Sequence, residues 1–263
     1  MKLVTFASGS SGNCTLVRDD TGGILIDAGI SMRRIQAGLS RQGLTFADLG
    51  GILITHDHSD HISGLPMVVK HHPVPVFAPR TVANHLLRSI PDLEDCITII
   101  GKEEPFSVKN FRITAFSTPH DTDESVGYCL EGEGRLGFCT DTGHVTETML
   151  AHLTGCTAAL IEANHDLERL RCGPYPVYLK RRILSERGHL SNVDCGALAC
   201  ALAESGTTSI VLGHLSRENN TPRLAYDTVR AALDGAGHAA VELLVAPADG
   251  DLELEIEPCC ASN

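Results

Sequence analysis

The sequence predicts a four-layer αββα sandwich, in which two β-sheets pack face to face and helices cover both outer faces. Apolar runs with strand character alternate with stretches of helical spacing, and each half of the chain is first rich in strands and then mixed α/β. No low-complexity linker or break in composition separates the halves. We therefore expect one domain over residues 1–263, with a core supplied by the 43% hydrophobic residues.

The first half opens with three short strands, and Gly22-Gly23 permits a hairpin turn between the second and the third. Two more strands follow, and helical spacing appears after the third, fourth and fifth strands. The expected strands are Lys2–Ala7, Cys14–Arg18, Gly23–Asp27, Gly51–Thr55 and Val74–Ala78. The expected helices are Ser31–Gly43, Ile62–His72 and Thr81–Ile90.

The middle of the chain is predicted to form two hairpins, which turn at Lys109-Asn110 and at residues 132–134. Helices and strands then alternate toward the end. The expected strands are Phe106–Val108, Phe111–Ser117, Val126–Glu131, Arg135–Thr140, Ala158–Glu162, Ser209–Leu212, Val241–Val245 and Leu252–Ile256. The expected helices are Val145–Leu153, Tyr178–Arg187, Val193–Glu204 and Arg223–Leu233.

The composition argues against several functions. The formal charge of −12 disfavours a protein that coats nucleic acid nonspecifically, and 4% aromatic residues without Trp disfavour a broad base-stacking surface. The sequence shows no secretory signal and no apolar span of transmembrane length. Its ten cysteines form no CxxC pair, which favours reduced thiols and a cytoplasmic location, with Cys259-Cys260 in a frayed terminus.

The most informative segment is Thr55-His56-Asp57-His58-Ser59-Asp60-His61, which follows the apolar run 51–54. A strand that ends in His-x-His-x-Asp-His can direct two imidazoles to one side and an Asp/His pair to the other. Neutral imidazoles and carboxylates suit Zn²⁺, Mn²⁺ or Fe²⁺. The segment therefore predicts a loop that holds two metal ions side by side.

Three further polar residues, His120, Asp141 and His214, each follow an apolar strand. A lone histidine at a strand end is usually only a satisfied polar residue, but with the metal loop these residues supply seven ligand groups, enough for two ions. The expected sets are His56, His58 and His120 on one ion, Asp60, His61 and His214 on the other, and Asp141 as a bridge over about 3.5–4 Å.

These seven residues resemble, one by one, the metal motifs of the metallo-β-lactamase superfamily, which implies that superfamily's αββα sandwich. Asp27, within Leu25–Gly29, matches its first motif, and the resemblance implies that Asp27 orients the metal loop from behind the ligands. A second supporting pair is suggested by the residues themselves. Glu162 and His165 are expected either to share a hydrogen bond behind the ligands or to be purely structural.

Other motifs are similar to the YycJ/WalJ-type branch of the superfamily. They are Ala7–Asn13, Glu162–Asp166, Tyr175-Pro176 with Leu179–Ser185, Gly188–Asn192, and His214–Ser216 with Asn219-Asn220. This resemblance implies a 5′→3′ DNA exonuclease that uses two divalent ions, Zn²⁺ or Mn²⁺ with Fe²⁺ also compatible, and a hydroxide between them as nucleophile. DNA is the expected partner, RNA is an alternative substrate, and no membrane is involved; the oligomeric state is left open.

His189 lies outside the ligand set, in the loop Gly188–Asn192. It could protonate the leaving oxygen, so His189 and Asp60 are the expected catalytic residues. Alternatively, the loop only starts a helix, with Ser191 or Asn192 as its N-cap.

The substrate contacts are expected in two segments. A basic cluster between residues 169 and 187 is either a solvated helix face or a phosphate-backbone contact. The segment Ser8–Gly12 is either a phosphate cradle of backbone N–H groups or a tight turn. The expected substrate-binding residues are Ser8, Ser10, Lys180 and Arg182.

Two other functions compete with a nuclease. A thioester or lactone hydrolase is the alternative enzyme, because the same ligands serve attack on a carbonyl and the fold alone does not choose between them. A non-catalytic metal or redox sensor would leave ligand positions unfilled, whereas all seven are filled here. The basic segment and the loop Gly188–Asn192 favour the nuclease.

Overall fold

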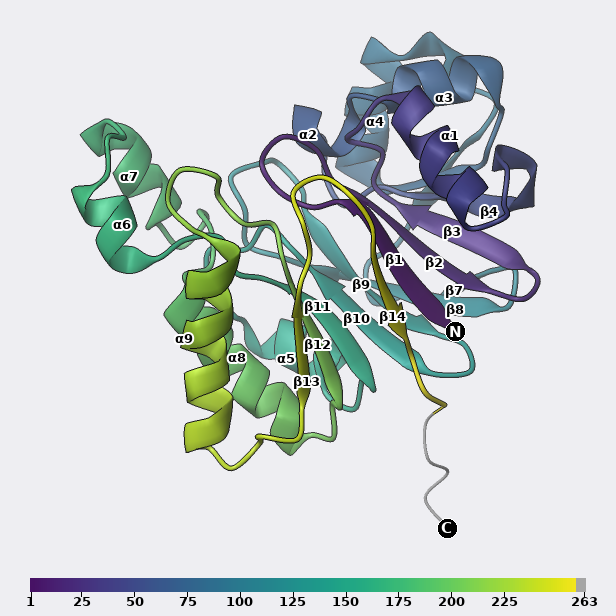
Figure 1. Ribbon diagram of the computed structural model, residues 1–263. Coiled ribbons are helices and arrows are strands. Elements are labelled where there is room, and N and C mark those ends of the chain that lie inside the picture. The colour runs from purple at the N-terminus through teal and green to yellow at the C-terminus, as the bar shows by residue number, and fades with distance from the viewer. Residues whose placement is uncertain (259–263) are drawn as a thin grey trace.

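Two seven-stranded sheets form the centre of the molecule, and helices cover their outer faces (Figure 1). This computed structural model describes residues 1–258, so the predicted frayed end at Cys259-Cys260 lies outside the described residues. The predicted four-layer αββα arrangement is confirmed. Apolar side chains of both sheets, such as Ile24 and Leu160, belong to one buried cluster. That shared core supports the prediction of a single domain, which stays a prediction.

The first sheet has the strand order β14-β1-β2-β3-β4-β5-β6. These strands are β1 (Lys2–Ala7), β2 (Cys14–Asp19), β3 (Gly22–Ile26), β4 (Leu49–Leu53), β5 (Val76–Pro79), β6 (Ile97–Ile100) and β14 (Leu252–Glu255). The helices of this half are α1 (Met32–Arg41), α2 (Ser59–Ile62), α3 (Leu65–His71) and α4 (Arg80–Ser89). Ile35, Val68 and Leu86 seal α1, α3 and α4 onto the sheet in a second buried cluster.

The second sheet has the order β13-β12-β11-β10-β9-β8-β7. Its strands are β7 (Phe106–Val108), β8 (Phe111–Ser117), β9 (Val126–Glu131), β10 (Arg135–Cys139), β11 (Ala158–Glu162), β12 (Ser209–Gly213) and β13 (Glu242–Val245). Met149, Leu198 and Val229 pack α5 (Glu147–Leu153), α8 (Asn192–Glu204) and α9 (Pro222–Gly235) onto this sheet. The helices α6 (Leu167–Cys172) and α7 (Val177–Ile183) form an arm that projects away from it (Figure 1).

The structure differs from the predicted elements in several helices and one strand. The helix expected over Ile62–His72 is divided at Gly64, where a Cβ would lie 1.9 Å from the Ile30 carbonyl oxygen. The helix expected over Tyr178–Arg187 ends at Ile183, because the backbone folds back and His189 N donates to Ile183 O at 3.0 Å. Strand β6 and helix α6 were not predicted at all.

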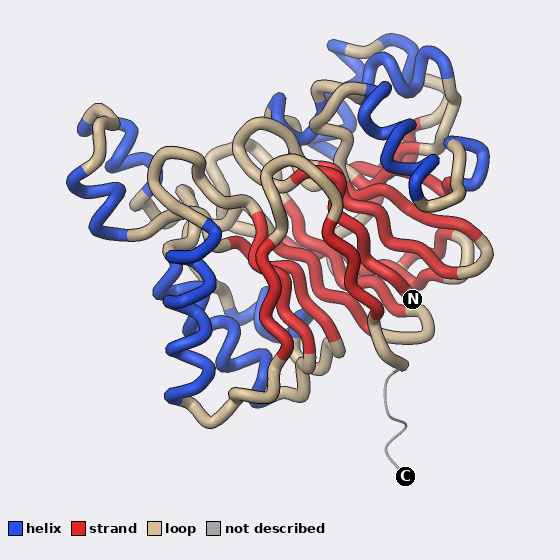
Figure 2. Tube along the Cα trace, viewed as in Figure 1, coloured by secondary structure: helices blue, strands red, loops and turns tan. Residues whose placement is uncertain are grey.

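The strand directions gather the functional loops at one edge. Strands β3 and β4 are parallel, and β1 shares their direction because β1 and β3 are both antiparallel to β2. By the same reasoning β8, β10, β11 and β12 share one direction. The loops that follow these strands lie together along one rim of the sheets (Figure 2). Within residues 1–258, no helix is long and apolar enough to cross a membrane.

Candidate metal centre

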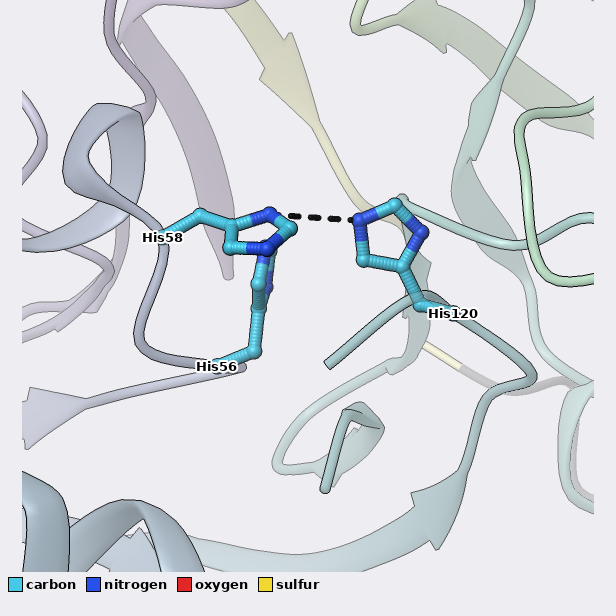
Figure 3. A group of neighbouring side chains, drawn as sticks. All are labelled: His56, His58 and His120. Atoms are coloured by element: carbon cyan, nitrogen blue, oxygen red, sulfur yellow. Dashed lines mark hydrogen bonds between the residues drawn. The ribbon is translucent and has the colours of Figure 1, made fainter. Parts of the chain in front are cut away.

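The first predicted ligand set is brought together by two loops. His56 and His58 come from the loop after β4, and His120 comes from the loop after β8; one nitrogen of each ring lies within 4.8 Å of the others. His58 Nδ1 and His120 Nε2 are 3.3 Å apart, and the three rings face a common point (Figure 3). His56 Nε2 is buried and has no hydrogen-bond partner among the described residues.

This first set has the chemistry of a metal site. Burial and the neighbouring His61 lower the pKa of His56 well below its ordinary value, so its ring is neutral and offers a lone pair. Burial likewise lowers the pKa of His120. A buried lone pair without a partner is costly unless something occupies it, and neutral imidazoles are the ligands that Zn²⁺ and similar ions prefer.

The second predicted set is also assembled. Asp60 and His61 lie in the short helix α2, and His214 follows β12. Asp60 Oδ2 lies 3.5 Å from both His61 Nε2 and His214 Nε2. Burial opposes ionisation of Asp60, but hydrogen bonds from these two histidines outweigh it and hold the pKa of Asp60 below its usual range. This set therefore carries a carboxylate charge that suits a divalent cation.

Asp141, the predicted bridge, lies between the two sets. Its Oδ2 is 3.2 Å from His61 Nε2, and its Oδ1 is 3.7 Å from His120 Nε2. The side chain is buried, and its carboxylate stays ionised because the charges of His214 and His61 overcome the burial that would raise its pKa. Asp141 thus contacts a member of each predicted ligand set, and the residues present fit two divalent ions.

Asp27 and Thr55 fix the orientation of the metal loop. His61 Nδ1 donates to Asp27 Oδ2 at 2.7 Å, and the Thr55 backbone N–H donates to Asp27 Oδ1 at 2.9 Å. The Thr55 hydroxyl also lies 3.0 Å from His56 Nδ1. Because these contacts occupy Nδ1, the Nε2 atom of each ring is left to face the ligand cluster. Asp27 therefore lies behind the ligands, where it was expected.

We expect Asp27→Asn to weaken metal binding about 10- to 100-fold, as the loss of a carboxylate behind a histidine ligand typically does. Asn keeps the shape of the side chain and tolerates the left-handed backbone of Asp27, whose φ is 61°. Titration of the metal-free protein with Zn²⁺ against a chromophoric chelator measures the effect. The exposed Asp20→Asn is the matched control. An unchanged affinity in Asp27→Asn would contradict the orienting role.

Strained backbone marks three of these positions. Asp27, Asp141 and His214 have φ values of 61°, 58° and 55°, in the left-handed region that residues other than glycine rarely adopt. Each is the first or second residue after its strand. Such conformations persist where the surrounding contacts over-determine them, which is common at functional sites.

Glu162 is the hydrogen-bond hub of the second half of the site. Its Oε1 accepts from His189 Nδ1 at 2.7 Å and from His214 Nδ1 at 2.9 Å. Its Oε2 accepts from the backbone N–H groups of Thr142 and Leu190 at 3.0 and 3.2 Å. Burial alone would raise its pKa, but the charge of His189 and these bonds lower the pKa of Glu162 to about 2.

The predicted pair of Glu162 with His165 is wrong. His165 is buried, and neither of its ring nitrogens has a hydrogen-bond partner within residues 1–258. Burial lowers the pKa of His165 to about 4, so its ring is neutral. Glu162 instead takes His189, 27 residues further along the chain, as its partner. Sequence spacing does not reveal that partner, because it depends on how the loop after β11 meets the loop before α8.

His189 lies against both predicted ligand sets. Its ring centroid is 5.0 Å from that of His120 and 5.4 Å from that of His214. Burial opposes protonation, but the Glu162 carboxylate outweighs it and raises the pKa of His189. The N-cap of α8 is Ser191, whose hydroxyl accepts from Asp194 N. Helix capping is therefore done by Ser191, and it does not account for the position of His189.

The loop after β1 supports the second ligand set. Ser8, predicted to bind substrate, is buried, and its hydroxyl accepts from His214 N at 2.8 Å. This contact gives the Ser8 hydroxyl a structural role in holding the His214 loop, and a substrate role for Ser8 stays a prediction. Ser10 is exposed on the same loop, and its substrate role stays a prediction. Asn13 was missed: its Nδ2 lies 3.0 Å from His61 Nε2 and 3.4 Å from Asp60 Oδ2.

The two predicted basic substrate contacts differ in their surroundings. Lys180 Nζ donates to the carbonyl oxygens of Arg171 and Gly173 at 2.8 and 2.7 Å, so its ammonium holds the end of α6. Arg182 instead pairs with Asp121. The other oxygen of Asp121 lies 3.4 Å from His120 Nε2, which places Arg182 at the border of the first ligand set. Asp121 itself was missed, although it directly follows His120 in sequence.

The fold and the ligand cluster agree with the similarity of this chain to known proteins. Residues 23–215 match the family model described as the beta-lactamase superfamily domain. The chain belongs to the metallo-β-lactamase superfamily, and it is a metal-dependent hydrolase. It is 37% identical over 240 residues to exodeoxyribonuclease YycJ of Bacillus anthracis, covering 90% of each chain. It is 35% identical over 234 residues to exodeoxyribonuclease WalJ of Streptococcus pneumoniae, covering 87% of this chain and 86% of that protein.

Solved structures show the same fold. The metallo-β-lactamase fold protein YhfI of Bacillus subtilis superposes with a TM-score of 0.74 at 12% identity, covering 96% of this chain and 98% of that one. Zn²⁺-bound PqqB of Methylobacterium extorquens superposes with a TM-score of 0.73 at 22% identity, covering 97% and 100%. At these identities the likeness concerns the fold alone.

Proposed function

We propose that this chain is a dinuclear metal-dependent phosphodiesterase that degrades DNA from the 5′ end. The observation that carries the proposal is that Asp141, a buried carboxylate, contacts both predicted ligand sets, with His189, which belongs to neither set, lying against both. The similarity to exodeoxyribonucleases YycJ and WalJ over most of the chain supports DNA as the substrate.

When bound, two divalent ions would supply a nucleophilic water at neutral pH and would neutralise charge on the phosphate oxygens. The protein contributes the rest. Asp27 and Glu162 hold His61 and His214 in one orientation through their Nδ1 atoms. Glu162 also binds His189 at Nδ1 and raises its pKa, so we assign to His189 the proton that the leaving oxygen needs. We assign to Arg182, which pairs with Asp121 at the border of the first set, the contact with a phosphate next to the scissile one.

The decisive experiment compares metal-reconstituted protein on single-stranded DNA, duplex DNA and RNA, each labelled at the 5′ or the 3′ end. We expect DNA hydrolysis that begins at the 5′ end, and no hydrolysis after chelation. A panel of thioesters and lactones tests the alternative of a small-molecule hydrolase. That alternative has some support from a 30% identity to a hydroxyacylglutathione hydrolase over 45% of the chain. Acyl hydrolysis without DNA hydrolysis would overturn the proposal.

The same preparation tests the two-ion site. We expect two metal ions per chain under metal-replete conditions, because two triads with a shared carboxylate are present. Elemental analysis of the active protein measures the ratio. A fully active protein with at most one ion would rule out the dinuclear mechanism and leave a mononuclear hydrolase.

A further inference from the structure

The arm formed by α6 and α7 exposes an apolar face that nothing in the described residues covers. Helix α7 turns Ile183 into the protein and leaves the opposite side in solvent. On that side Val177 is 65% exposed, Tyr178 is 73% exposed, and Leu184 just beyond the helix is 44% exposed. This exposure is unusual for tyrosine, because its large ring is usually at least partly buried.

Positive charge accompanies this face. Arg181, three residues after Tyr178, is exposed and has no hydrogen bond or ion pair within residues 1–258. Its neighbours Lys180 and Arg182 are already engaged by carbonyl oxygens and by Asp121. Arg181 therefore leaves a free cation three residues from the exposed Tyr178, although the chain carries a net charge of −12. Proteins that bind single-stranded nucleic acid combine aromatic side chains with positive charge, and this face offers both.

The position of this face relative to the ligand cluster follows from the spacing of residues on α7. Arg182 pairs with Asp121, which contacts His120 of the first ligand set. Tyr178 is four residues before Arg182 on the same helix, about 6 Å along its axis. Successive stacked nucleotides rise by about 3.4 Å, so a phosphate that met Arg182, as the proposed function assigns, would lie about two nucleotides from Tyr178. The arm projects away from the second sheet (Figure 1), so a strand that leaves the site along α7 would pass over this face.

We propose that the face of α7 formed by Val177, Tyr178 and Arg181 binds single-stranded DNA, with an unpaired base stacked on Tyr178 and the backbone phosphate beside it held by Arg181. The inference rests on the proposed nuclease function and names the form of its substrate. A base within a duplex has neighbours on both faces, so only an unpaired base can offer a face to the ring. The strand is therefore single-stranded for at least the nucleotides nearest the site.

The test uses metal-reconstituted wild type, Tyr178→Ala and Tyr178→Phe, with Tyr226→Ala as the matched control. Tyr226 lies on α9 and is 38% exposed, so its loss removes a surface ring elsewhere. The substrates are bis(p-nitrophenyl) phosphate, which has no base, and a single-stranded DNA 12-mer. A second 12-mer carries abasic nucleotides at positions two to four from the cleaved end.

We expect Tyr178→Ala to lower kcat/KM on the DNA 12-mer by about 5- to 140-fold, the range for loss of one stacked base. Tyr178→Phe and Tyr226→Ala should stay near wild type on that substrate. All four proteins should hydrolyse bis(p-nitrophenyl) phosphate alike, because the ligand cluster is untouched. The abasic 12-mer should reduce the wild type to the level of Tyr178→Ala and leave that variant unchanged.

Four results would overturn the inference. A Tyr178→Ala protein that equals wild type on the DNA 12-mer would show that the ring binds no base. An equal loss on both substrates would assign Tyr178 a structural role. A change in sedimentation coefficient with unchanged DNA kinetics would make the face an interface between two copies of the chain. Stronger dependence on Tyr178 with an RNA 12-mer would overturn the assignment to DNA. If wild type itself cleaves no DNA, it is the proposed function that fails.

Discussion

Replacement of Asp141 by Asn should lower kcat/KM for DNA by at least about 10³-fold and reduce the metal content from two ions per chain to one or none. Asp141 is the carboxylate that both predicted ligand sets approach, with contacts of 3.2 Å to His61 and 3.7 Å to His120. Asn keeps the size of the side chain and tolerates its φ of 58°, so the main change is the loss of one negative charge between two cations.

Elemental analysis and steady-state kinetics on the same preparation measure both effects. Asp123→Asn is the matched control, because Asp123 lies close by in the loop after β8 but its side chain is 74% exposed. Thermal unfolding of the metal-free proteins shows whether Asn at position 141 folds normally. Two ions per chain and a wild-type rate in Asp141→Asn would remove Asp141 from the site.

Replacement of His189 by Ala should lower kcat by about 10²- to 10⁴-fold, while the metal content stays near that of the wild type. The expectation follows from its position: Glu162 binds its Nδ1 atom, and its ring lies between His120 and His214 without belonging to either triad. Removing a proton donor slows departure of the leaving oxygen but takes no ligand from the ions.

A substrate with a better leaving group tests this assignment further. The p-nitrophenolate group of a p-nitrophenyl phosphodiester departs with little protonation. His189→Ala should therefore lose much less activity on this phosphodiester than on DNA. Ser191→Ala is the control for the loop, since it removes the N-cap of α8 and should cost stability of about 1 kcal/mol with little change in rate. Loss of metal in His189→Ala would identify His189 as a ligand, and a wild-type rate would end its catalytic assignment.

Much of the candidate site could be predicted because its ligands either lie next to one another in the sequence or follow an apolar strand. His56, His58, Asp60 and His61 are adjacent, and His120 and His214 each close an apolar strand. In a two-sheet sandwich the ends of parallel strands lie at one rim. Residues that follow these strands can therefore be predicted to lie close together even when no side-chain contact is known. The structure brings them together in two adjoining triads, and their roles as ligands stay predictions for the metal analysis to test.

The contacts around the ligands could not be predicted in this way. Ser8 holds the backbone of His214 across 206 positions of sequence, and Glu162 turns to His189 and not to the nearer His165. Lys180 and Arg182 look equivalent in the sequence, yet one holds the end of α6 and the other reaches Asp121. In each case the partner lies on a different segment of the chain, and the packing of the segments against each other selects it.

The sequence by itself thus predicted the sandwich, all of its strands except β6 and the seven candidate metal ligands, because strand periodicity and ligand chemistry are local properties. Only the tertiary structure decided which carboxylate orients which histidine, which basic side chains are already engaged, and that Tyr178 is left 73% exposed on the α7 arm. Hydrogen bonds and burial join segments far apart in the chain, and their geometry is fixed only when the two sheets and their loops pack together.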